Sequence, residues 1–179
     1  METRLSCFRD FRQALSLRIR FDSKDFRLTK PTVGLIGVGE MGQPMGLNLI
    51  AAGFSLVVYD VRPEALQEVK KGGARVASSP ADVAQLSDVI ISILPSSKIV
   101  KEVLVRGKDC VLSNIEKRHT VIEMSTLDVD TTLDLERLIR ERGAKFIDAP
   151  IIGVPEKVKT RDILIVASGY AMIRLVENP

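Results

Sequence analysis

Three glycines at the spacing Gly-x-Gly-x-x-Gly give this chain its clearest chemical signal. They follow a short apolar run over 33–36 and precede apolar side chains at helical spacing over 43–52. Gly37 permits a sharp exit from a strand, Gly39 lets the main chain approach a pyrophosphate, and Gly42 lets a helix pack closely on the strand. Free N–H groups at the helix start add positive potential. The expected phosphate-binding turn comprises Gly37, Val38, Gly39, Glu40, Met41 and Gly42.

A carboxylate further along the chain favours a dinucleotide over a simple phosphate. Asp60 ends the next apolar run, about 20 residues beyond the turn, where an acid can accept hydrogen bonds from ribose hydroxyls. Its negative charge would repel a 2′-phosphate and so favours NAD, whereas Arg62 keeps NADP open. The alternative is a plain strand–helix–strand unit with a glycine turn and no ligand.

The elements that would position these residues alternate regularly from Pro31 onwards. The runs are continuously apolar, which is typical of a parallel sheet covered on both faces. We therefore expect an α/β fold with a doubly wound (Rossmann), mostly parallel sheet. Strands are expected at 32–37, 55–60, 75–77, 88–94, 120–124, 145–148 and 162–167, and helices at 41–52, 63–71, 80–86, 97–105 and 128–142.

Composition narrows the class of protein. The 179 residues are 45% hydrophobic and 27% charged, enough for one sizeable domain with its own core. The net charge of +3 is concentrated in residues 1–30, so the rest is slightly acidic and no nucleic-acid partner is expected. Cys7 and Cys110 lack paired spacing, which predicts neither disulfides nor a metal site. No apolar run could cross a membrane, so we expect no membrane partner and a cytoplasmic location.

Residues 1–30 differ from the rest, since arginine and phenylalanine alternate there without a strict period. An organelle-targeting segment is one interpretation, although its acids argue against it because transit peptides are poor in acids. A start site drawn too early is another. We expect a basic N-terminal extension over 1–30 without a catalytic role, and a disordered one is among the options. A dinucleotide-binding domain over 31–179 should follow.

Three further residues could in principle do acid–base chemistry. His119, the one histidine, stands beside Lys117 and Arg118, so we expect a solvated loop residue. Lys157 and Lys159 precede the last expected strand, and we expect solvated charges in a loop.

Four stretches together carry a family resemblance. They are Gly-Leu-Ile-Gly-Val-Gly-Glu-Met-Gly-Gln-Pro-Met over 34–45, Ile-Leu-Pro over 93–95, Glu-Met-Ser-Thr over 123–126 and Asp-Ala-Pro over 148–150. In order and spacing they resemble the β-hydroxyacid dehydrogenases, which include 3-hydroxyisobutyrate and 6-phosphogluconate dehydrogenases. The resemblance covers the N-terminal cofactor domain of that family and not its C-terminal helical domain.

The resemblance implies hydride transfer between a nicotinamide cofactor and a small 3-hydroxy acid. It places the glycine turn on the pyrophosphate, Leu94 and Pro95 beside the cofactor, Thr126 near the nicotinamide and Ser125 near substrate. All lie at carboxyl ends of expected strands, where open α/β sheets bind ligands. Taken alone, Leu94-Pro95 could be a plain turn, and Ser125-Thr126 could be helix caps.

The chain departs from the family on the substrate side. The family's Asp-Ala-Pro-Val-Ser-Gly-Gly reads here with Ile152 in place of the serine and Val154 in place of the second glycine, leaving Gly153 as the retained substrate-loop residue. Arg-Asp-Ile over 161–163 replaces Gly-Thr-Leu. The family's catalytic lysine belongs to the later helical domain, and neither Lys157 nor Lys159 matches its context, so no catalytic residue is assigned.

These departures leave three hypotheses open. In the first, the 179 residues bind NAD or NADP with little or no turnover, a partner chain would supply the helices and lysine, and both a homo- and a hetero-oligomer stay open. In the second, the chain is a non-catalytic dinucleotide-binding or regulatory module. In the third, it is the product of a truncated reading frame that folds poorly.

Overall fold

A single twisted sheet organises the chain. The computed structural model describes residues 30–169, so residues 1–29 of the extension expected over 1–30 and the last ten residues lie outside the described part. The strand order is β3-β2-β1-β4-β5-β6-β9. All neighbours are parallel except β9, which runs antiparallel to β6. The strands are β1 (Val33–Ile36), β2 (Leu56–Tyr59), β3 (Arg75–Val76), β4 (Val89–Ser92), β5 (Thr120–Glu123), β6 (Lys145–Asp148) and β9 (Ser168–Gly169).

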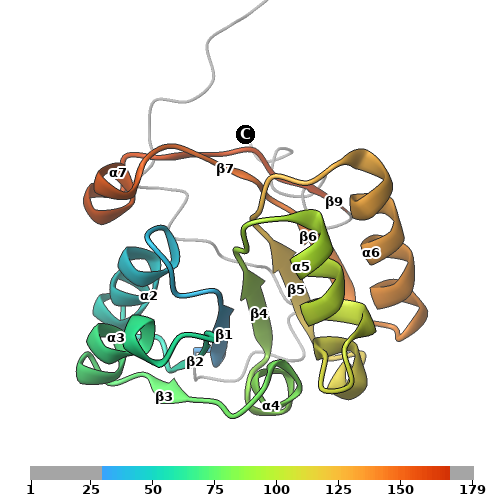
Figure 1. The fold of residues 1–179 in the computed structure, drawn as a ribbon, viewed down its shortest axis with the longest axis horizontal. Helices are drawn as coiled ribbons and strands as arrows, with labels where there is room; N and C mark the ends of the chain where they lie inside the picture. The colour runs from blue at the N-terminus through green and yellow to red at the C-terminus, as the bar shows by residue number, and fades with distance from the viewer. Residues whose placement is uncertain (1–29, 170–179) are drawn as a thin grey trace, which may run out of the picture.

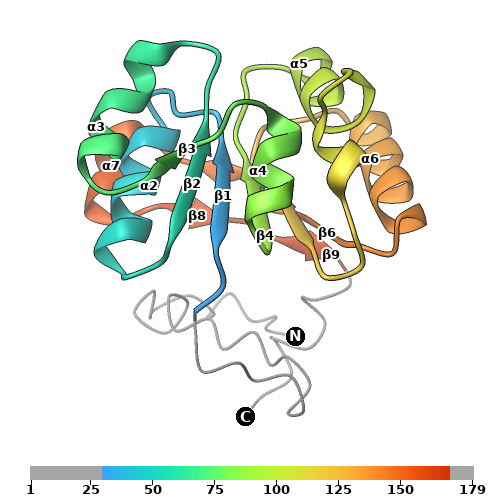
Figure 2. The ribbon, with the colours of Figure 1, turned by 90° about the horizontal axis from the view of Figure 1, so that it is seen from below.

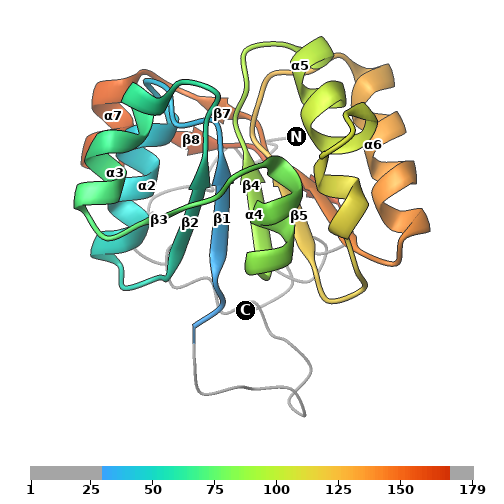
Figure 3. The same cartoon turned by 60° about the horizontal axis from the view of Figure 1, so that its bottom comes forward.

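Helices cover both faces of this sheet, which confirms the doubly wound α/β fold. One core joins the sheet to α4, α5 and α6, and the other joins it to α2 and α3. Figures 2 and 3 show α2 and α3 on one side of the molecule and α5 and α6 on the other. The helices are α2 (Gly42–Ala51), α3 (Gln67–Lys71), α4 (Pro80–Leu86), α5 (Ser97–Lys101), α6 (Val129–Glu141) and α7 (Pro155–Thr160).

Side-chain caps explain where several helices begin. Ser79, Ser96 and Asp128 each accept a hydrogen bond from the amide three residues later, at the starts of α4, α5 and α6. The expected helix over 63–71 is a 3-10 turn (Pro63–Leu66) that continues into α3, and the one over 97–105 is α5 followed by a π-helical turn (Glu102–Arg106).

The C-terminal part of the domain differs from the expectation. The strand expected over 162–167 is instead β8 (Leu164–Ile165), which pairs with β7 (Ile151–Ile152) in a separate two-stranded sheet. Ile151 and Ile165 lie opposite each other in this pairing and are partly buried against the core that α2 also covers. Between the two strands lies α7, which packs on α2 (Figure 1).

Lys157 and Lys159 therefore lie on a helix, and their expected placement in a loop is wrong. Both are exposed as expected, and the Lys157 ammonium pairs with Asp162 at 2.7 Å.

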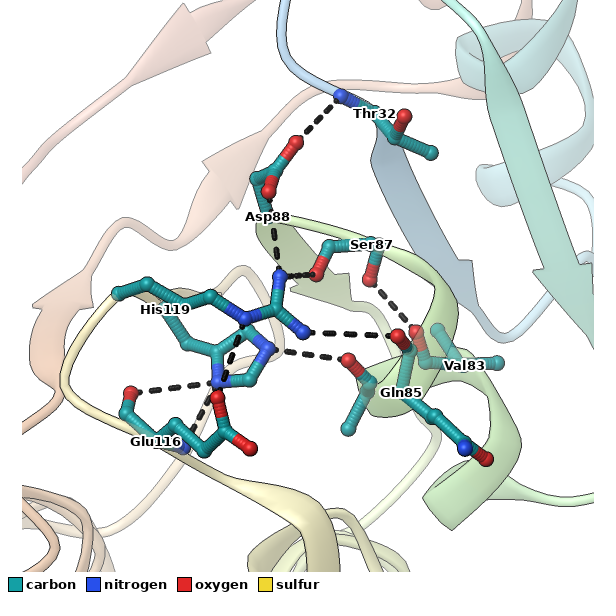
Figure 4. A network of polar contacts seen from close by, with 9 residues as sticks. Thr32, Val83, Gln85, Ser87, Asp88, Glu116 and His119 are labelled. Atoms are coloured by element: carbon teal, nitrogen blue, oxygen red, sulfur yellow. Dashed lines mark hydrogen bonds and ion pairs between the residues drawn. The ribbon is translucent and has the colours of Figure 1, made fainter. Parts of the chain in front are cut away.

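His119 is the main correction to the sequence-based expectations, because it is fully buried. Its Nδ1 accepts from the Glu116 amide at 2.7 Å, and its Nε2 donates to the Ala84 carbonyl at 3.0 Å. Arg118 lies beside it and donates to the main-chain carbonyl of Ser87 at 3.0 Å and to Asp88 at 3.1 Å. This network, drawn in Figure 4, ties the end of α4 to the amino ends of β4 and β5.

Burial favours the neutral form of His119. Burial and the nearby Arg118 charge lower the pKa of His119 below its usual 6.5. Between that lowered pKa and 6.5 the unfolded chain binds more protons than the folded one, so the free energy of unfolding falls as pH decreases. Below the folded pKa the loss levels off.

We expect the free energy of unfolding to fall between pH 7.5 and 5 by about 1.4 kcal/mol for each unit by which the pKa of His119 is lowered. Urea denaturation at several pH values measures it. A His119→Gln variant should be less stable at pH 7.5 but lose most of this pH dependence. Burial raises the pKa of Glu123, which acts in the opposite direction, so an unchanged slope in the variant would assign the effect elsewhere.

Candidate functional site

The expected cofactor residues meet where the strand order reverses. The chain leaves β1 toward β2 and β3 on one side, and β4, β5 and β6 lie on the other. Open α/β sheets bind ligands outside the carboxyl ends of their strands at this point. The turn over 37–42, Asp60, and the loops that follow β4 and β5 all lie at that edge.

Two glycines make the turn possible through close main-chain contacts. Gly37 has a φ of +92°, and a Cβ there would stand 2.1 Å from the carbonyl oxygen of Ile93. A Cβ on Gly42 would stand 1.9 Å from the carbonyl oxygen of Gly37. Both distances are far inside van der Waals contact, so neither position admits a side chain without a main-chain shift.

Gly39, in contrast to Gly37 and Gly42, has no main-chain atom close to the position of a Cβ. A Cβ on Gly39 would meet, within 4 Å, only a guanidinium nitrogen of Arg62, at 3.3 Å. Among residues 30–169, no hydrogen-bond acceptor contacts the amide nitrogens of Gly39, Glu40, Met41 and Gly42. The first turn of α2 has no capping side chain and no acidic residue. These four N–H groups and the helix dipole form a cradle for an anion.

Asp60 lies beside this cradle, but its carboxylate is already engaged. One oxygen accepts from the Val38 amide at 2.8 Å, and the other accepts from the amide and Nε of Arg62 at 2.9 and 3.2 Å. Partial burial favours the neutral acid, but the hydrogen bonds from Arg62 and Val38 outweigh it and lower the pKa of Asp60. A cavity of about 230 Å³ opens next to this pair, lined by Gly39, Glu40, Gln43 and Arg62 among others.

A buried polar chain joins the ends of β4 and β5, and we call Ser92, Glu123 and Ser125 the β4–β5 brace. The Ser92 hydroxyl donates to one Glu123 oxygen, and the Ser125 amide donates to the other at 2.7 Å. The Ser125 hydroxyl accepts from the Leu94 amide at 2.8 Å. All three brace residues are at most 4% exposed, whereas Pro95, three residues after Ser92, and Thr126, directly after Ser125, are exposed.

Burial raises the pKa of Glu123, and the hydrogen bonds from Ser125 and Ser92 counter this only in part. The nearby Asp148 adds a smaller effect in the same direction, and burial raises the pKa of Asp148 as well. The Glu123 carboxyl group therefore favours its neutral form more than an exposed glutamate does, and both of its oxygens accept hydrogen bonds within the brace.

The two residues expected near substrate differ in exposure: Ser125 is buried, whereas Gly153 is exposed. Ser125 is 4% exposed and its hydroxyl is bonded within the brace, which favours a supporting role; a direct substrate contact stays a prediction. Gly153 is exposed in the turn after β7. Ile152 and Val154 are exposed there, together with Leu164 of β8 and Val166 just after it. These four side chains are 46–58% exposed, and we call them the outer apolar face.

Sequence reasoning did not single out Ser92 or Glu123. Each is a polar residue at the end of a mostly apolar strand, and that signal could have marked them. In the described part of the chain, no cluster of histidine, cysteine and carboxylates could hold a metal ion, and no helix is long and apolar enough to span a bilayer.

Comparison with known families decides what this arrangement is. The model of the NAD-binding domain of 6-phosphogluconate dehydrogenase matches residues 32–174. The chain belongs to this family of NAD-binding domains. The match includes the glycine turn, Asp60 and the β4–β5 brace.

Several relatives share this domain. Mitochondrial 3-hydroxyisobutyrate dehydrogenase of Rattus norvegicus is 44% identical over 125 residues, 70% of this chain and 37% of the rat protein. The cytokine-like nuclear factor N-PAC of Pongo abelii is 32% identical over 79% of this chain and 25% of its own length. The crystal structure of 3-hydroxyisobutyrate dehydrogenase from Salmonella typhimurium superposes with a TM-score of 0.74 at 25% identity, covering 82% of this chain and 51% of that one. This chain thus spans about 37% of the curated dehydrogenase relatives.

The contrast between Gly42 and Gly39 predicts opposite effects on stability. Gly42→Ala forces a main-chain shift and should cost about 3 kcal/mol, a fall in Tm of roughly 6–12 °C. Gly39→Ala meets only the end of a flexible side chain, so its Tm should change by less than about 2 °C. Differential scanning calorimetry of the two variants measures this, and equal losses would contradict the described geometry of the turn.

Proposed function

We propose that residues 30–169 bind a nicotinamide dinucleotide, with NAD preferred over NADP, as part of an oxidoreductase that acts on a small hydroxy acid. The observation that carries this is the cradle of N–H groups from Gly39 to Gly42 beside Asp60. A pyrophosphate supplies the anion that such a cradle lacks within the protein. Family membership supports the dinucleotide, and the names of the dehydrogenase relatives support the hydroxy acid.

The two nucleosides divide between the two sides of the strand reversal. Asp60 ends the β2 side, where the adenosine ribose can reach a carboxylate. The other nucleoside then lies over the ends of β4 and β5, beside Leu94, Pro95 and Thr126. The bound nicotinamide would accept or give the hydride. Among the described residues we assign binding and orientation, not proton transfer.

The glycine turn tests this proposal directly. The chain has no tryptophan, so the fluorescence of bound NADH can be followed without interference from that residue. We expect saturable binding by the wild type. Gly39→Ala should fold normally but weaken binding at least tenfold, since a methyl group over the cradle costs on the order of 1.4 kcal/mol of lost phosphate contacts. Equal affinity of the two proteins, or no binding by the wild type, would contradict the proposal.

Cofactor preference depends on competition between the Arg62 guanidinium and the ribose hydroxyls for hydrogen bonds to the Asp60 carboxylate. A carboxylate has about four acceptor sites, and the amides of Val38 and Arg62 with the Arg62 guanidinium occupy most of them on Asp60. Ribose hydroxyls must therefore displace the guanidinium, which is about half exposed and able to swing away. Once displaced, it could pair with a 2′-phosphate, but the Asp60 charge opposes that group.

We expect NADH to bind the wild type more tightly than NADPH. Arg62→Ala removes the competitor and should leave NADH affinity equal or higher while weakening NADPH about tenfold. Asp60→Asn should shift the preference the other way, because it removes the repulsion and one ribose acceptor. Calorimetric titration of the three proteins with both cofactors measures this. Tighter NADPH binding by the wild type would overturn the NAD preference.

A non-catalytic dinucleotide-binding module is the second candidate. The outer apolar face, where Ile152 stands in place of a hydrogen-bonding serine, favours it, as does a relative named as a nuclear factor. Oxidation of 3-hydroxyisobutyrate by the whole protein with NAD would support the enzyme, whereas binding of NADH without turnover of small hydroxy acids would support the module.

A cytoplasmic location remains our proposal. The mitochondrial names of several relatives make organelle import the alternative, which cell fractionation would separate.

A further inference from the structure

The side chains of the β4–β5 brace are buried, yet they hydrogen-bond to the loops after β4 and β5. These loops lie where the nicotinamide half of the cofactor is proposed to bind. We propose that Glu123 is a positioning residue: through Ser125 it fixes the Leu94 main chain where the nicotinamide half of the dinucleotide binds. The proposal rests on the dinucleotide-binding function proposed above. It concerns one half of the cofactor and not the phosphate cradle.

The hydrogen bond from the Leu94 amide to Ser125 is one of few that hold the loop after β4. Leu94, Pro95 and Ser96 lie between the end of β4 and the start of α5. The Leu94 amide donates to the Ser125 hydroxyl at 2.8 Å. The preceding residue, Ile93, is held by the sheet, since its amide donates to Ile36 at 3.0 Å. The Ser125 hydroxyl therefore fixes the first residue of the loop that the sheet leaves free.

Glu123 in turn fixes Ser125. Its carboxyl group accepts from the Ser125 amide at 2.7 Å and from the Ser92 hydroxyl, so it joins the last residue of β4 to the loop after β5. The side chain is fully buried and closes β5, whose Glu123 carbonyl also accepts from the Ala149 amide at 2.7 Å. Buried polar groups with all partners satisfied hold one geometry, because every alternative leaves an unpaired group in the core.

The loop that the brace holds touches the phosphate turn. A Cβ on Gly37 would lie 2.1 Å from the Ile93 oxygen and 3.1 Å from a Leu94 methyl group. A dinucleotide that lies across the strand reversal must pass this contact on its way to β4 and β5. A small displacement of the loop should therefore alter the nicotinamide side first, because among residues 30–169 no brace residue hydrogen-bonds to Asp60 or to the amides of Gly39 to Gly42.

The test compares NADH with ADP-ribose, which lacks the nicotinamide. Ser125→Ala removes the acceptor of the Leu94 amide and should weaken NADH about five- to tenfold, the equivalent of one hydrogen bond, with ADP-ribose affinity unchanged within about twofold. Glu123→Ala should give the same split. Glu123→Gln should restore NADH affinity, because an amide can accept from Ser125 and donate to Ser92.

Ser87→Ala is the matched control. Ser87 is equally buried and its hydroxyl donates to the Val83 carbonyl at 2.6 Å, but it lies at the amino end of β4. Its NADH and ADP-ribose affinities should both equal those of the wild type. NADH fluorescence measures one ligand and calorimetry the other, and Ser125→Ala keeps the test available if Glu123→Ala does not fold.

The outcomes separate the two proposals. A wild type that binds neither ligand defeats the dinucleotide proposal. A wild type that binds both, together with a Ser125→Ala variant that binds both normally or loses both equally, defeats the positioning role alone. Weaker NADH binding in Ser87→Ala as well would show a general loss of packing and would also overturn the positioning role.

Discussion

Three main-chain segments meet at the strand reversal with no side chain between them, and the site depends on that contact. The carbonyl of Gly37 faces Gly42, and the carbonyl of Ile93 faces Gly37. The exit of β1, the start of α2 and the loop after β4 are therefore packed against one another. This contact aims the first N–H groups of α2 outward, and it sets how far the loop after β4 stands from them. Any side chain at either glycine would separate the two halves of a dinucleotide site.

Two polar networks, each with a fully buried titratable side chain, lie at the opposite ends of the central strands. At the amino edge, His119 and Arg118 bind carbonyls at the end of α4. At the carboxyl edge, Glu123 links β4 to the loop after β5. The central strands have only four residues each, so their ends bring polar groups into the core, and these groups need partners. The amino-edge network serves stability, whereas the carboxyl-edge network lies against the candidate site and serves geometry there as well.

Local patterns in the sequence predicted the parts of the fold that local physics decides. The glycine turn and the parallel apolar strands follow from residues close together in the chain, and the structure confirms them. His119 was assigned wrongly because its charged neighbours suggested solvent, while its burial depends on a carbonyl of α4, 35 residues earlier. The strand expected over 162–167 is present but short, as β8 (Leu164–Ile165), and its antiparallel pairing with β7 outside the main sheet was not expected. The local sequence pattern indicates neither the hydrogen-bond partner of His119 nor the strand that pairs with β8.

The two sides of the site are built by different means, and this decides how far each can be inferred. The cradle consists of main-chain groups, whose chemistry is the same for every residue that the turn admits, so the spacing of three glycines carries most of the information. The proposed substrate side would be built from side chains, and there this chain presents Ile152 and Val154 on an outer apolar face. An isoleucine cannot replace the hydrogen bond of a serine, so the family's substrate contact does not transfer to that position. Membership of the family therefore constrains the cofactor much more strongly than the molecule on which it would act.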